Sequence, residues 1–568
     1  METAFCASPE IFRQALPIFL YISHSDNDNM LLDNACLNTM IAAFNHFPPL
    51  QTLLDTAKQY GLIAICLPNK TIPALSLSEN ATQAEKTLRH RLQNAFGCLQ
   101  FAGANVLRDI LPDTELWLMP PEAAHRLHEY FPQAPIWQTT ALPQTEAVAQ
   151  KPWFIPPCRP KPQRAAIIGA GIAGAATARA LAERGVQVCV LESARPAEAA
   201  SGNRQGLLYT RISPHDTEQT ELLLCGYGHT RRLLERLLPK QTSWGGAGVL
   251  HLNHEPAEQQ RNTLLSRQTH HNHLYHSVSA AEASAAAGID LNEEGLFWPQ
   301  GVWLHPPALV AALFKHPNIT LHNFSPLQTA QHTGSHWQLT TPNDIIEADC
   351  IIYCTGADSA ALPPLNILPF RLVRGQTSLA PATSLSENLR IALSGDSYLA
   401  PAWQGIHCYG ATFIQHDSAS DWRETEEQAN RQALGRLHPE LARSLLSDRH
   451  NLRGHAALRC DTSDHLPVVG ALGDAAAMQP LYARLALDRK YPLTAACPYL
   501  PGVYINTAHG SRGLSSAPIC ADSLAAEILG LPNPLSRRIR QALHPNRFII
   551  RAIARGTLYS TPTKTESP

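Results

Sequence analysis

Three glycines and one acid between Arg164 and Glu192 have the residue types and the spacing of a dinucleotide-binding site. Gly169, Gly171 and Gly174 follow a short apolar run at G-x-G-x-x-G spacing, and Glu192 lies 18 residues beyond the third glycine (192 − 174). The glycines permit a tight turn, close approach of a pyrophosphate and close packing of a helix on a strand, while the acid can accept ribose hydroxyls. The phosphates would then meet the N–H groups at a helix N-terminus.

The elements that must position this motif lie on both sides of it. Residues 165–168 and 186–191 are apolar runs typical of buried strands, and the small residues of 175–184 favour a helix between them. A further apolar strand over residues 349–356 ends in Thr-Gly. We expect it to return to the same sheet, beside the first glycine loop.

A second glycine-rich loop lies near the C-terminus. Residues 502–518 predict a strand and a loop, and a helix is expected over 519–529, so a second helix N-terminus can offer N–H donors to a ligand. Between these returns, strand-like segments predict an antiparallel sheet; they are 244–252, 295–306, 319–321, 337–340, 345–347, 369–377, 397–401 and 406–413. This arrangement suits FAD better than NAD, because FAD needs protein along its ribityl chain and ring.

These elements predict an α/β protein with a Rossmann-like FAD-binding domain that is interrupted by an antiparallel-sheet substrate domain and preceded by a small α/β N-terminal domain. The expected divisions are a domain over 1–149, a proline-rich linker over 150–163, an oxidoreductase over 164–545 and a basic C-terminal tail over 546–568. Within the oxidoreductase, we expect FAD-binding segments at about 164–245, 345–365 and 456–535, and substrate-domain segments at about 246–344 and 366–455.

The first 150 residues contain no readable site. Strands are expected at 17–22, 62–67 and 116–119, and helices at 30–44 and 84–96. Only three glycines lie in this segment, and none forms a glycine-rich loop after a strand, so we predict no site for a nucleotide or for S-adenosylmethionine. A packing or docking module is the simplest interpretation of this segment.

Composition excludes several classes of function. The net charge of −2 gives no global basic field, and no apolar run reaches the ~18 residues of a membrane span. The start of the chain lacks the basic n-region of a secretory signal. The 13 cysteines form no C-x-x-C and the 26 histidines form no metal-ligand spacing, so we expect reduced thiols, no metal and a cytoplasmic location.

Several motifs together resemble the glycine oxidase and D-amino-acid oxidase class of flavoproteins; they lie at 169–192, 201–206, 355–356, 373–376 and 459–470. Closer still, the sequence at 152–154, 201–206, 464–467, 510–518 and 544–547 is similar to the oxidoreductase half of the bacterial bifunctional proteins that make 5-methylaminomethyl-2-thiouridine in tRNA. The match runs from about 151 to 555. The first 150 residues do not resemble the methyltransferase that usually accompanies it, so methyl transfer is expected in a separate protein or not at all.

The resemblance implies FAD and further residues around it. In addition to the first glycine motif and Glu192, these are Ser201, Gly202, Gln205, Gly206, Leu327, Gly356, Gly510, Ser511, Arg512, Gly513, Leu514 and Ser515. Ser201 is also a residue type that can cap a helix. Leu327 occupies the position at which this class pairs backbone with adenine.

The resemblance also implies a substrate, carboxymethylaminomethyl-(2-thio)uridine at the tRNA wobble position. Its side chain, R–CH2–NH–CH2–COO⁻, is an N-substituted glycine, which explains why a scaffold similar to glycine oxidase would serve. The amine would give a hydride from its glycine carbon to the flavin, and hydrolysis of the imine would release aminomethyluridine and glyoxylate. Oxygen is the expected acceptor for the reduced flavin. Beyond deprotonation of the amine no protein acid or base is strictly required, and the sequence does not identify a catalytic base.

A carboxylate substrate needs a guanidinium partner, because the planar fork binds it in a bidentate manner. Arg459 occupies the place of the substrate-binding arginine in the glycine oxidase motif, and its alternative role is a structural ion pair with Asp461 or Asp464. Arg374 is the second candidate, and its alternative role is support of the backbone near the flavin. Tyr398 and Tyr409 can donate a hydroxyl to the carboxylate or simply pack in the sheet; of the two, we include Tyr398 in the predicted catalytic set.

A tRNA anticodon loop also requires a cationic surface. Arginines at 537, 538, 540, 547, 551 and 555 lie among aromatic and aliphatic neighbours near the C-terminus, where a solvated or core-capping helix is the alternative. Two other functions stay open at this point. One is a small-molecule amine oxidase for glycine, sarcosine or a D-amino acid, and the other is a tRNA-binding scaffold with a vestigial flavin site.

Overall fold

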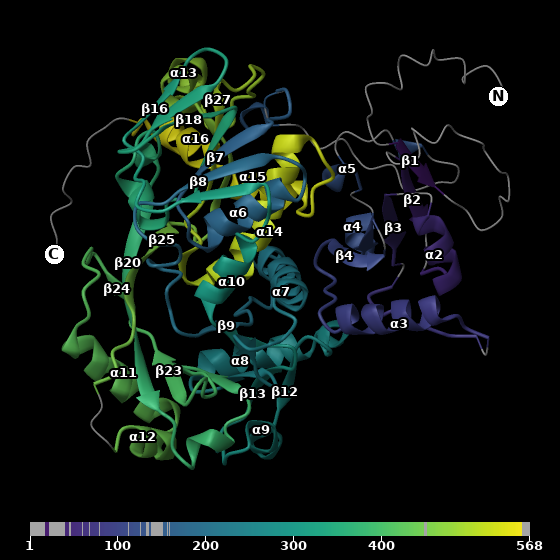
Figure 1. The fold of residues 1–568 in the computed structure, drawn as a ribbon, viewed down its shortest axis with the longest axis vertical. Coiled ribbons are helices and arrows are strands. Elements are labelled where there is room, and N and C mark those ends of the chain that lie inside the picture. The colour runs from purple at the N-terminus through teal and green to yellow at the C-terminus, as the bar shows by residue number, and fades with distance from the viewer. Residues whose placement is uncertain are drawn as a thin grey trace.

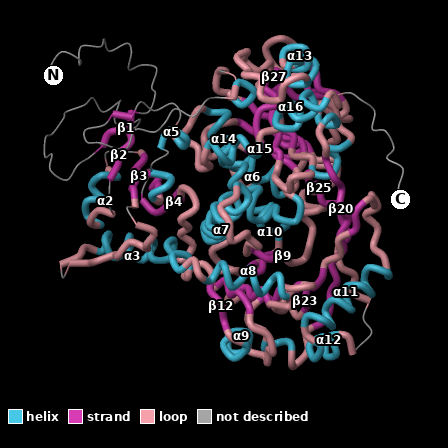
Figure 2. The backbone as a smooth tube through the Cα atoms, turned by 180° about the vertical axis from the view of Figure 1, so that it is seen from behind, coloured by secondary structure: helices cyan, strands magenta, loops and turns pink. Residues whose placement is uncertain are grey.

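The computed structural model describes residues 18–21, 40–44, 47–58, 61–67, 69–78, 80–111, 113–124, 127–131, 136–137, 151–155, 157, 159–447 and 451–558. They form a smaller N-terminal part and a larger part, which lie side by side in Figure 1. The larger part contains one mainly parallel sheet and one mainly antiparallel sheet. Between the two sheets, in Figures 1 and 2, lie the helices α6 (Ile172–Ala182), α7 (Glu218–Leu237), α10 (Pro306–Leu313) and α14 (Gly513–Leu529).

The parallel sheet carries the first glycine motif. Its strand order is β15-β8-β7-β19-β27-β26, in which only β26 is antiparallel to its neighbour. Its strands are β7 (Arg164–Ile168), β8 (Gln187–Leu191), β15 (Ile319–His322), β19 (Cys350–Tyr353), β26 (Val468–Gly473) and β27 (Tyr499–Thr507). The central strands are covered on both faces, which is why their sequences are nearly continuous apolar runs. This arrangement confirms the predicted Rossmann-like architecture.

Different elements cover the two faces of this sheet. One face packs on α6 and α14, and nine of the 11 residues of α6 are buried small or apolar residues, which lets α14 approach closely. The other face packs on a small sheet and on a C-terminal helix; these are β16 (Thr329–His332), β17 (Trp337–Thr340), β18 (Ile345–Ala348) and α16 (Asn546–Arg555). The sheet is therefore the centre of the FAD-binding part.

The second large sheet has the order β12-β13-β11-β21-β22-β23-β20-β24, and β25 also pairs with β20. Its strands are β11 (Val249–Leu252), β12 (His276–Val278), β13 (Gly295–Trp298), β20 (Phe370–Pro381), β21 (Ala392–Ser394), β22 (Tyr398–Leu399), β23 (Ile406–Gly410), β24 (Ile414–Gln415) and β25 (Ala456–Thr462). The long strand β20 pairs with β25 over 370–376 and with β23 over 377–381, so it joins the FAD-binding part to the substrate-side sheet.

The remaining elements surround these sheets. A three-stranded sheet contains β9 (Gly206–Leu208), β10 (Trp244–Gly245) and β14 (Val302–Leu304). The other helices of the larger part are α8 (Pro256–Ser266), α9 (Ala280–Ala287), α11 (Glu424–Leu437), α12 (Pro439–Leu445), α13 (Ala475–Leu481) and α15 (Arg537–Leu543). No helix in the described ranges combines the length and the apolar character that a membrane crossing requires.

The N-terminal part is a small α/β unit, as predicted. Its sheet has the order β4-β5-β3-β2-β1-β6, in which only β4 is antiparallel. Its elements are β1 (Ile18–Tyr21), β2 (Met40–Phe44), β3 (Leu62–Cys66), β4 (Asn105–Leu111), β5 (Thr114–Met119), β6 (Ile136–Trp137), α2 (Leu50–Ala57), α3 (Gln83–Phe96), α4 (Pro121–Ala124) and α5 (Leu127–Tyr130). The helix predicted over 30–44 is wrong for residues 40–44, which form β2, and 30–39 lie outside the described residues. An apolar run as short as this one fits either period.

Buried polar contacts join the N-terminal part to the helices that pack on the parallel sheet. Arg108 donates to Asp522 of α14 at 2.8 Å, and Arg184, just after α6, donates to the other oxygen of Asp522 at 2.5 Å. Nearby, the backbone N–H of Phe101 donates to His271 at 3.1 Å. The N-terminal part therefore docks against the oxidoreductase through charges that are largely removed from water.

Three further expectations need correction. Residues 319–321 were expected in an antiparallel substrate-side sheet, but β15 is parallel to β8 at the edge of the nucleotide sheet. The helix expected from 519 begins at Gly513 and contains Pro518 in its second turn. The carbonyl oxygen of Leu514, which loses its N–H partner there, accepts the Thr230 hydroxyl at 2.8 Å. The expected basic tail begins as α16, whose apolar face is buried against the sheet, while 559–568 lie outside the described residues.

The proline-rich linker is held against the oxidoreductase. The carbonyl oxygen of Trp153 accepts hydrogen bonds from the Tyr499 hydroxyl and the Asn546 side chain, both at 2.9 Å. Phe154 is buried and its ring contacts His544. The linker is thus part of the surface of the FAD-binding part.

Candidate active site

The glycine loop between β7 and α6 has no room for side chains. Gly169 has a φ of 101°, which favours glycine, and a Cβ added to Gly174 would lie 1.9 Å from the carbonyl oxygen of Gly169. Gly171 precedes α6 and provides no side-chain cap. The first N–H groups of α6 therefore lie at the loop, where those that have no partner within the protein can bind an anion.

Glu192 and Ser201 lie at the edge of this loop. The carboxylate of Glu192, at the end of β8, accepts the N–H groups of Ala170 at 2.7 Å and Ala194 at 2.9 Å. The hydroxyl of Ser201 accepts the N–H of Ile172 at 3.0 Å, so it caps α6 from a distant segment. Both predicted residues are therefore next to the first helical turn.

The second predicted loop lies beside the first. Gly510 has a φ of 55° and begins a short 3-10 turn that leads into α14, which also lacks a side-chain cap. A Cβ on Gly206 would lie 2.8 Å from Leu514, and one on Gly513 would lie 3.6 Å from Ile172. The other predicted residues of this loop, Ser511, Arg512 and Ser515, belong to the same turn and the first turn of α14.

The segment 201–206 crosses between the two helix N-termini. Gly202 is tightly enclosed, since an added Cβ would lie 2.8 Å from the carbonyl oxygen of Ala197. Gln205 is fully buried; its Nε2 donates to Pro401 at 2.9 Å, while its Oε1 has no hydrogen-bond partner. A buried acceptor of this kind is costly unless a ligand donor satisfies it. The residues present here fit FAD.

Two more predicted residues lie at the rim. Gly356 follows β19 with a φ of 50°, close to the first glycine loop, whose Gly169 is packed against the carbonyl of Cys354. Leu327 is half-buried in the loop between β15 and β16, near Ser325, whose N–H donates to the carbonyl oxygen of Glu192 at 2.8 Å. Their contacts with the cofactor remain predictions.

Arg459 on β25 has no acidic partner within ion-pairing distance in the part of the chain that the structure describes. Asp461 pairs with His465 at 2.7 Å and Asp464 pairs with Arg547 at 3.0 Å, so neither forms the structural ion pair considered as an alternative. One guanidinium nitrogen donates to the carbonyl oxygen of Thr412 at 3.2 Å. Burial lowers the pKa of Arg459, an effect that the negative charge of a bound carboxylate would oppose.

The position of Arg374 does not suit the role of a substrate ligand, because its side chain is buried and bonded within the protein. Its side chain is 0% exposed and donates to Glu426 at 2.5 Å, to Ala419 O at 2.6 Å and to Asp421 O at 2.5 Å. These contacts correspond to the alternative of backbone support. We therefore do not retain Arg374 as a substrate ligand.

Tyr398 and Tyr409 also have partners within the protein. The Tyr398 hydroxyl donates to Gln205 O at 3.1 Å, and burial raises its pKa well above the usual range, opposed by the nearby charge of Arg459. The Tyr409 hydroxyl donates to Glu427 at 3.1 Å in the core of the sheet. Tyr398 is therefore near the proposed carboxylate site, whereas Tyr409 supports the sheet.

Three of the six C-terminal arginines pair with acidic side chains. Arg538 pairs with Asp216 at 2.9 Å, while Arg547 and Arg551 both pair with Asp464, at 3.0 and 2.8 Å. These pairs correspond to the alternative of a core-capping helix. They neutralise the charge of these three arginines, which are therefore less available to a nucleic acid.

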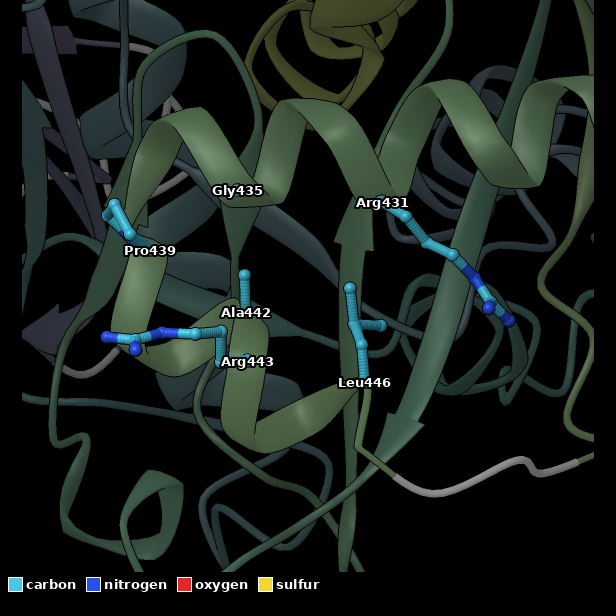
Figure 3. Close-up of a pocket in the computed structure, with 6 residues that line it drawn as sticks. All are labelled: Arg431, Gly435, Pro439, Ala442, Arg443 and Leu446. Atoms are coloured by element: carbon cyan, nitrogen blue, oxygen red, sulfur yellow. The ribbon is translucent and has the colours of Figure 1, made fainter.

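A hollow of about 540 Å³ lies between α11 and α12, away from the glycine loops. It is lined by Arg431, Gly435, Pro439, Ala442, Arg443 and Leu446, and Figure 3 shows the two arginines pointing in different directions at its sides. None of the predicted site residues lines it. No group of histidine, cysteine and acidic side chains suited to a metal occurs among the described residues.

The family of FAD dependent oxidoreductases matches residues 164–527. The chain belongs to this family. FAD is therefore the cofactor of this oxidoreductase, and the prediction drawn from its two glycine loops is confirmed.

Curated relatives extend the similarity. The tRNA 5-methylaminomethyl-2-thiouridine biosynthesis bifunctional protein MnmC of Pseudomonas putida is 39% identical over 411 residues, which are 71% of this chain and 62% of that protein. The protein of the same name from Pseudomonas syringae is 40% identical over 421 residues, which are 72% of this chain and 63% of that protein. The chain thus spans less than two thirds of the length of these relatives.

Solved structures share the fold. Glycine oxidase from Bacillus cereus superposes with a TM-score of 0.51 at 17% identity, over 65% of this chain and 95% of that chain. Iminodiacetate oxidase from Chelativorans superposes with a TM-score of 0.53 at 21% identity, over 67% of this chain and 99% of that chain. These similarities confirm the predicted fold class.

Two residues at the site were not predicted from the sequence. Gly375 lies beneath Arg459, since an added Cβ would be 2.1 Å from a guanidinium nitrogen. Phe413 is 59% exposed, and the Arg459 guanidinium carbon lies 4.6 Å from its ring centre. A glycine inside a strand often marks a close approach, so Gly375 carried a readable signal. Nothing in the local sequence predicted that Phe413 would be exposed beside Arg459.

Proposed function

We propose that this oxidoreductase removes the carboxymethyl group from carboxymethylaminomethyl-(2-thio)uridine at the wobble position of tRNA, releasing aminomethyluridine and glyoxylate. The names of the relatives support a role in tRNA modification. The observation that carries the proposal is Arg459, a partly buried guanidinium without an acidic partner in the described structure. Its charge acts on Tyr398, whose hydroxyl contacts Gln205 in the segment that crosses between the two glycine loops. Such a group fits the carboxylate of an N-substituted glycine.

The residues of the chain bind and orient this substrate. Arg459 holds the carboxylate, and its contact with Thr412 O fixes the guanidinium. Tyr398, which donates to Gln205 O, keeps the wall of the site in contact with the 201–206 segment. Orientation of the amine relative to the cofactor is the main contribution that the protein can make here.

Bound FAD would supply the two-electron oxidation, in which the glycine carbon of the substrate loses a hydride and its nitrogen loses a proton. The substrate becomes the imine R–CH2–N=CH–COO⁻, and addition of water gives R–CH2–NH2 and glyoxylate. We assign the acceptance of electrons from the reduced cofactor to oxygen. Methyl transfer is assigned to a separate protein, and the anticodon loop of tRNA is the macromolecular partner.

The test mixes the purified yellow protein with tRNA that carries the carboxymethylaminomethyl nucleoside. We expect that nucleoside to be lost while aminomethyl nucleoside and glyoxylate form. In a second experiment, cells without the protein should accumulate the carboxymethylaminomethyl form in their tRNA. Oxidation of free glycine, sarcosine or a D-amino acid, with no change in the tRNA, would instead identify a small-molecule amine oxidase.

A further inference from the structure

Phe413 has an unusual position for a large apolar side chain. It is 59% exposed, in the loop that follows β23. A single exposed apolar residue is common and needs no explanation. Phe413 differs because its ring lies 4.6 Å from the guanidinium carbon of Arg459, the residue proposed to hold the substrate carboxylate. Loss of this exposed side chain alone would not weaken the core.

The loop 411–423, which carries Phe413 and includes the short strand β24, is held firmly by buried side chains. Arg374 donates to the carbonyl oxygens of Ala419 and Asp421, at 2.6 and 2.5 Å. Gln376 donates to Arg423 O at 2.8 Å, so the far end of the loop is attached to the same strand. The buried arginine and glutamine of β20 therefore fix the position of the loop.

The near end of the loop is fixed as well. The hydroxyl of Thr412 donates to Glu426 and accepts the backbone N–H of Gln376. Its carbonyl oxygen accepts the guanidinium of Arg459 at 3.2 Å. Phe413, the next residue, is thus presented at a fixed place beside the proposed carboxylate site.

A second pair of an arginine and an aromatic ring lies near the other end of the loop. The guanidinium carbon of Arg453 lies 4.8 Å from the ring centre of Trp422, and Arg453 is exposed. Aromatic side chains next to arginines are typical of sites for unpaired nucleotides, in which bases stack on rings and cations contact the backbone.

The substrate is long enough for its base to lie near Phe413 while its carboxylate is bound by Arg459. Four single bonds separate the carboxylate carbon from the pyrimidine ring in R–CH2–NH–CH2–COO⁻, a span of about 5 Å when extended. With its carboxylate bound by Arg459, whose guanidinium carbon lies 4.6 Å from the Phe413 ring centre, the substrate has a reach that allows its base to contact the exposed side of that ring. A free amino acid has no group to place there.

We propose that Phe413 is the stacking platform for the pyrimidine base of the substrate, and so selects a nucleotide over a free amino acid. This inference rests on the proposed function, because it assumes that Arg459 binds the carboxylate attached to that base. Arg374 is then a positioning residue, which acts by holding the loop.

The test compares two substrates in Phe413→Ala and in wild-type protein. One is tRNA with the carboxymethylaminomethyl nucleoside, and the other is sarcosine, which has the N-substituted glycine without a base. Because stacking on an aromatic side chain contributes ~1–3 kcal/mol per base, we expect kcat/KM for the tRNA to fall about 5- to 150-fold. The value for sarcosine should fall by a clearly smaller factor, because sarcosine loses only the contact between the ring and Arg459. Phe413→Tyr should restore activity on tRNA.

Leu487→Ala is the matched control, because Leu487 is also an exposed apolar side chain, at 91% exposure, far from the loop in sequence. It should change neither value. If sarcosine binds without turnover, its dissociation constant is measured from the change in flavin absorbance. The effect of Phe413→Ala on that constant then replaces the effect on kcat/KM. An equal loss for both substrates, or no loss for tRNA, would overturn the inference. Failure of the wild-type protein to act on the tRNA would instead refute the proposed function.

Discussion

Replacement of Gly375 by alanine should displace Arg459 without removing its charge. The added Cβ would lie 2.1 Å from the guanidinium nitrogen, whereas ordinary contacts between such atoms are about 3.5 Å, so the guanidinium must move by more than ~1 Å. Arg459 is a flexible side chain and the clash is with its far end, so the fold should tolerate the change. A misplacement of about 1 Å at a binding group can cost ~100-fold in rate. We expect kcat/KM for an N-substituted glycine to fall about 10- to 100-fold, mainly through KM.

The assay is reduction of the bound flavin in the absence of oxygen, followed at increasing substrate concentration. Gly435→Ala is the control, since an added Cβ there meets no atom within 4 Å. Arg459→Ala should lower kcat/KM further than Gly375→Ala, and all three variants should retain FAD. An unchanged KM in Gly375→Ala, together with a large loss in Arg459→Ala, would show that the guanidinium binds substrate from a position other than the one above Gly375.

Three further predictions follow from contacts described above. Gly174→Ala should abolish retention of FAD, measured by absorbance after gel filtration, because its Cβ would lie 1.9 Å from a backbone oxygen; retention of a full complement of FAD would contradict this. Asp522→Asn should lower the free energy of unfolding in urea by about 3–5 kcal/mol, since it leaves Arg108 and Arg184 without their buried partner; a loss below ~1 kcal/mol would mean that water screens the pair. Burial lowers the pKa of five histidines to about 2 or 3; they are His229, His251, His271, His509 and His544. Unfolding lets each of them bind a proton with its ordinary pKa of about 6.5, so the free energy of unfolding should fall as the pH is lowered below 6.5. Urea titrations between pH 7 and 5 that show no change would contradict the buried neutral state.

The glycine loops could be predicted from the sequence because their requirements are local. Gly169, Gly171 and Gly174 lie between an apolar strand and a run of small residues, and all the evidence for that motif lies within 30 residues. The position of β15 could not be predicted in this way, since its partner β8 is more than 120 residues earlier in the chain (319 − 191). Its short apolar segment contains nothing that distinguishes a parallel from an antiparallel neighbour.

The roles of the arginines illustrate the same limit at the site. Arg374 and Arg459 both lie in motifs similar to those of amine-oxidising flavoproteins, and the sequence does not tell which of them has an acidic partner. Glu426, 52 residues beyond Arg374, supplies that partner on α11. Arg459 is left with a carbonyl oxygen and an aromatic ring. The distinction depends on long-range packing, which local patterns do not contain.

Asp522 has a consequence for how the chain can be divided. It lies on the helix whose first turn borders the flavin loop, yet one of its two arginines comes from the N-terminal part. Proteolytic cleavage in the proline-rich segment should therefore leave two fragments that stay together. Their separation would leave the buried carboxylate of Asp522 with only one of its two arginine partners. For the same reason, an N-terminal part taken from a distant lineage could be grafted here only if it brought an arginine to the place of Arg108.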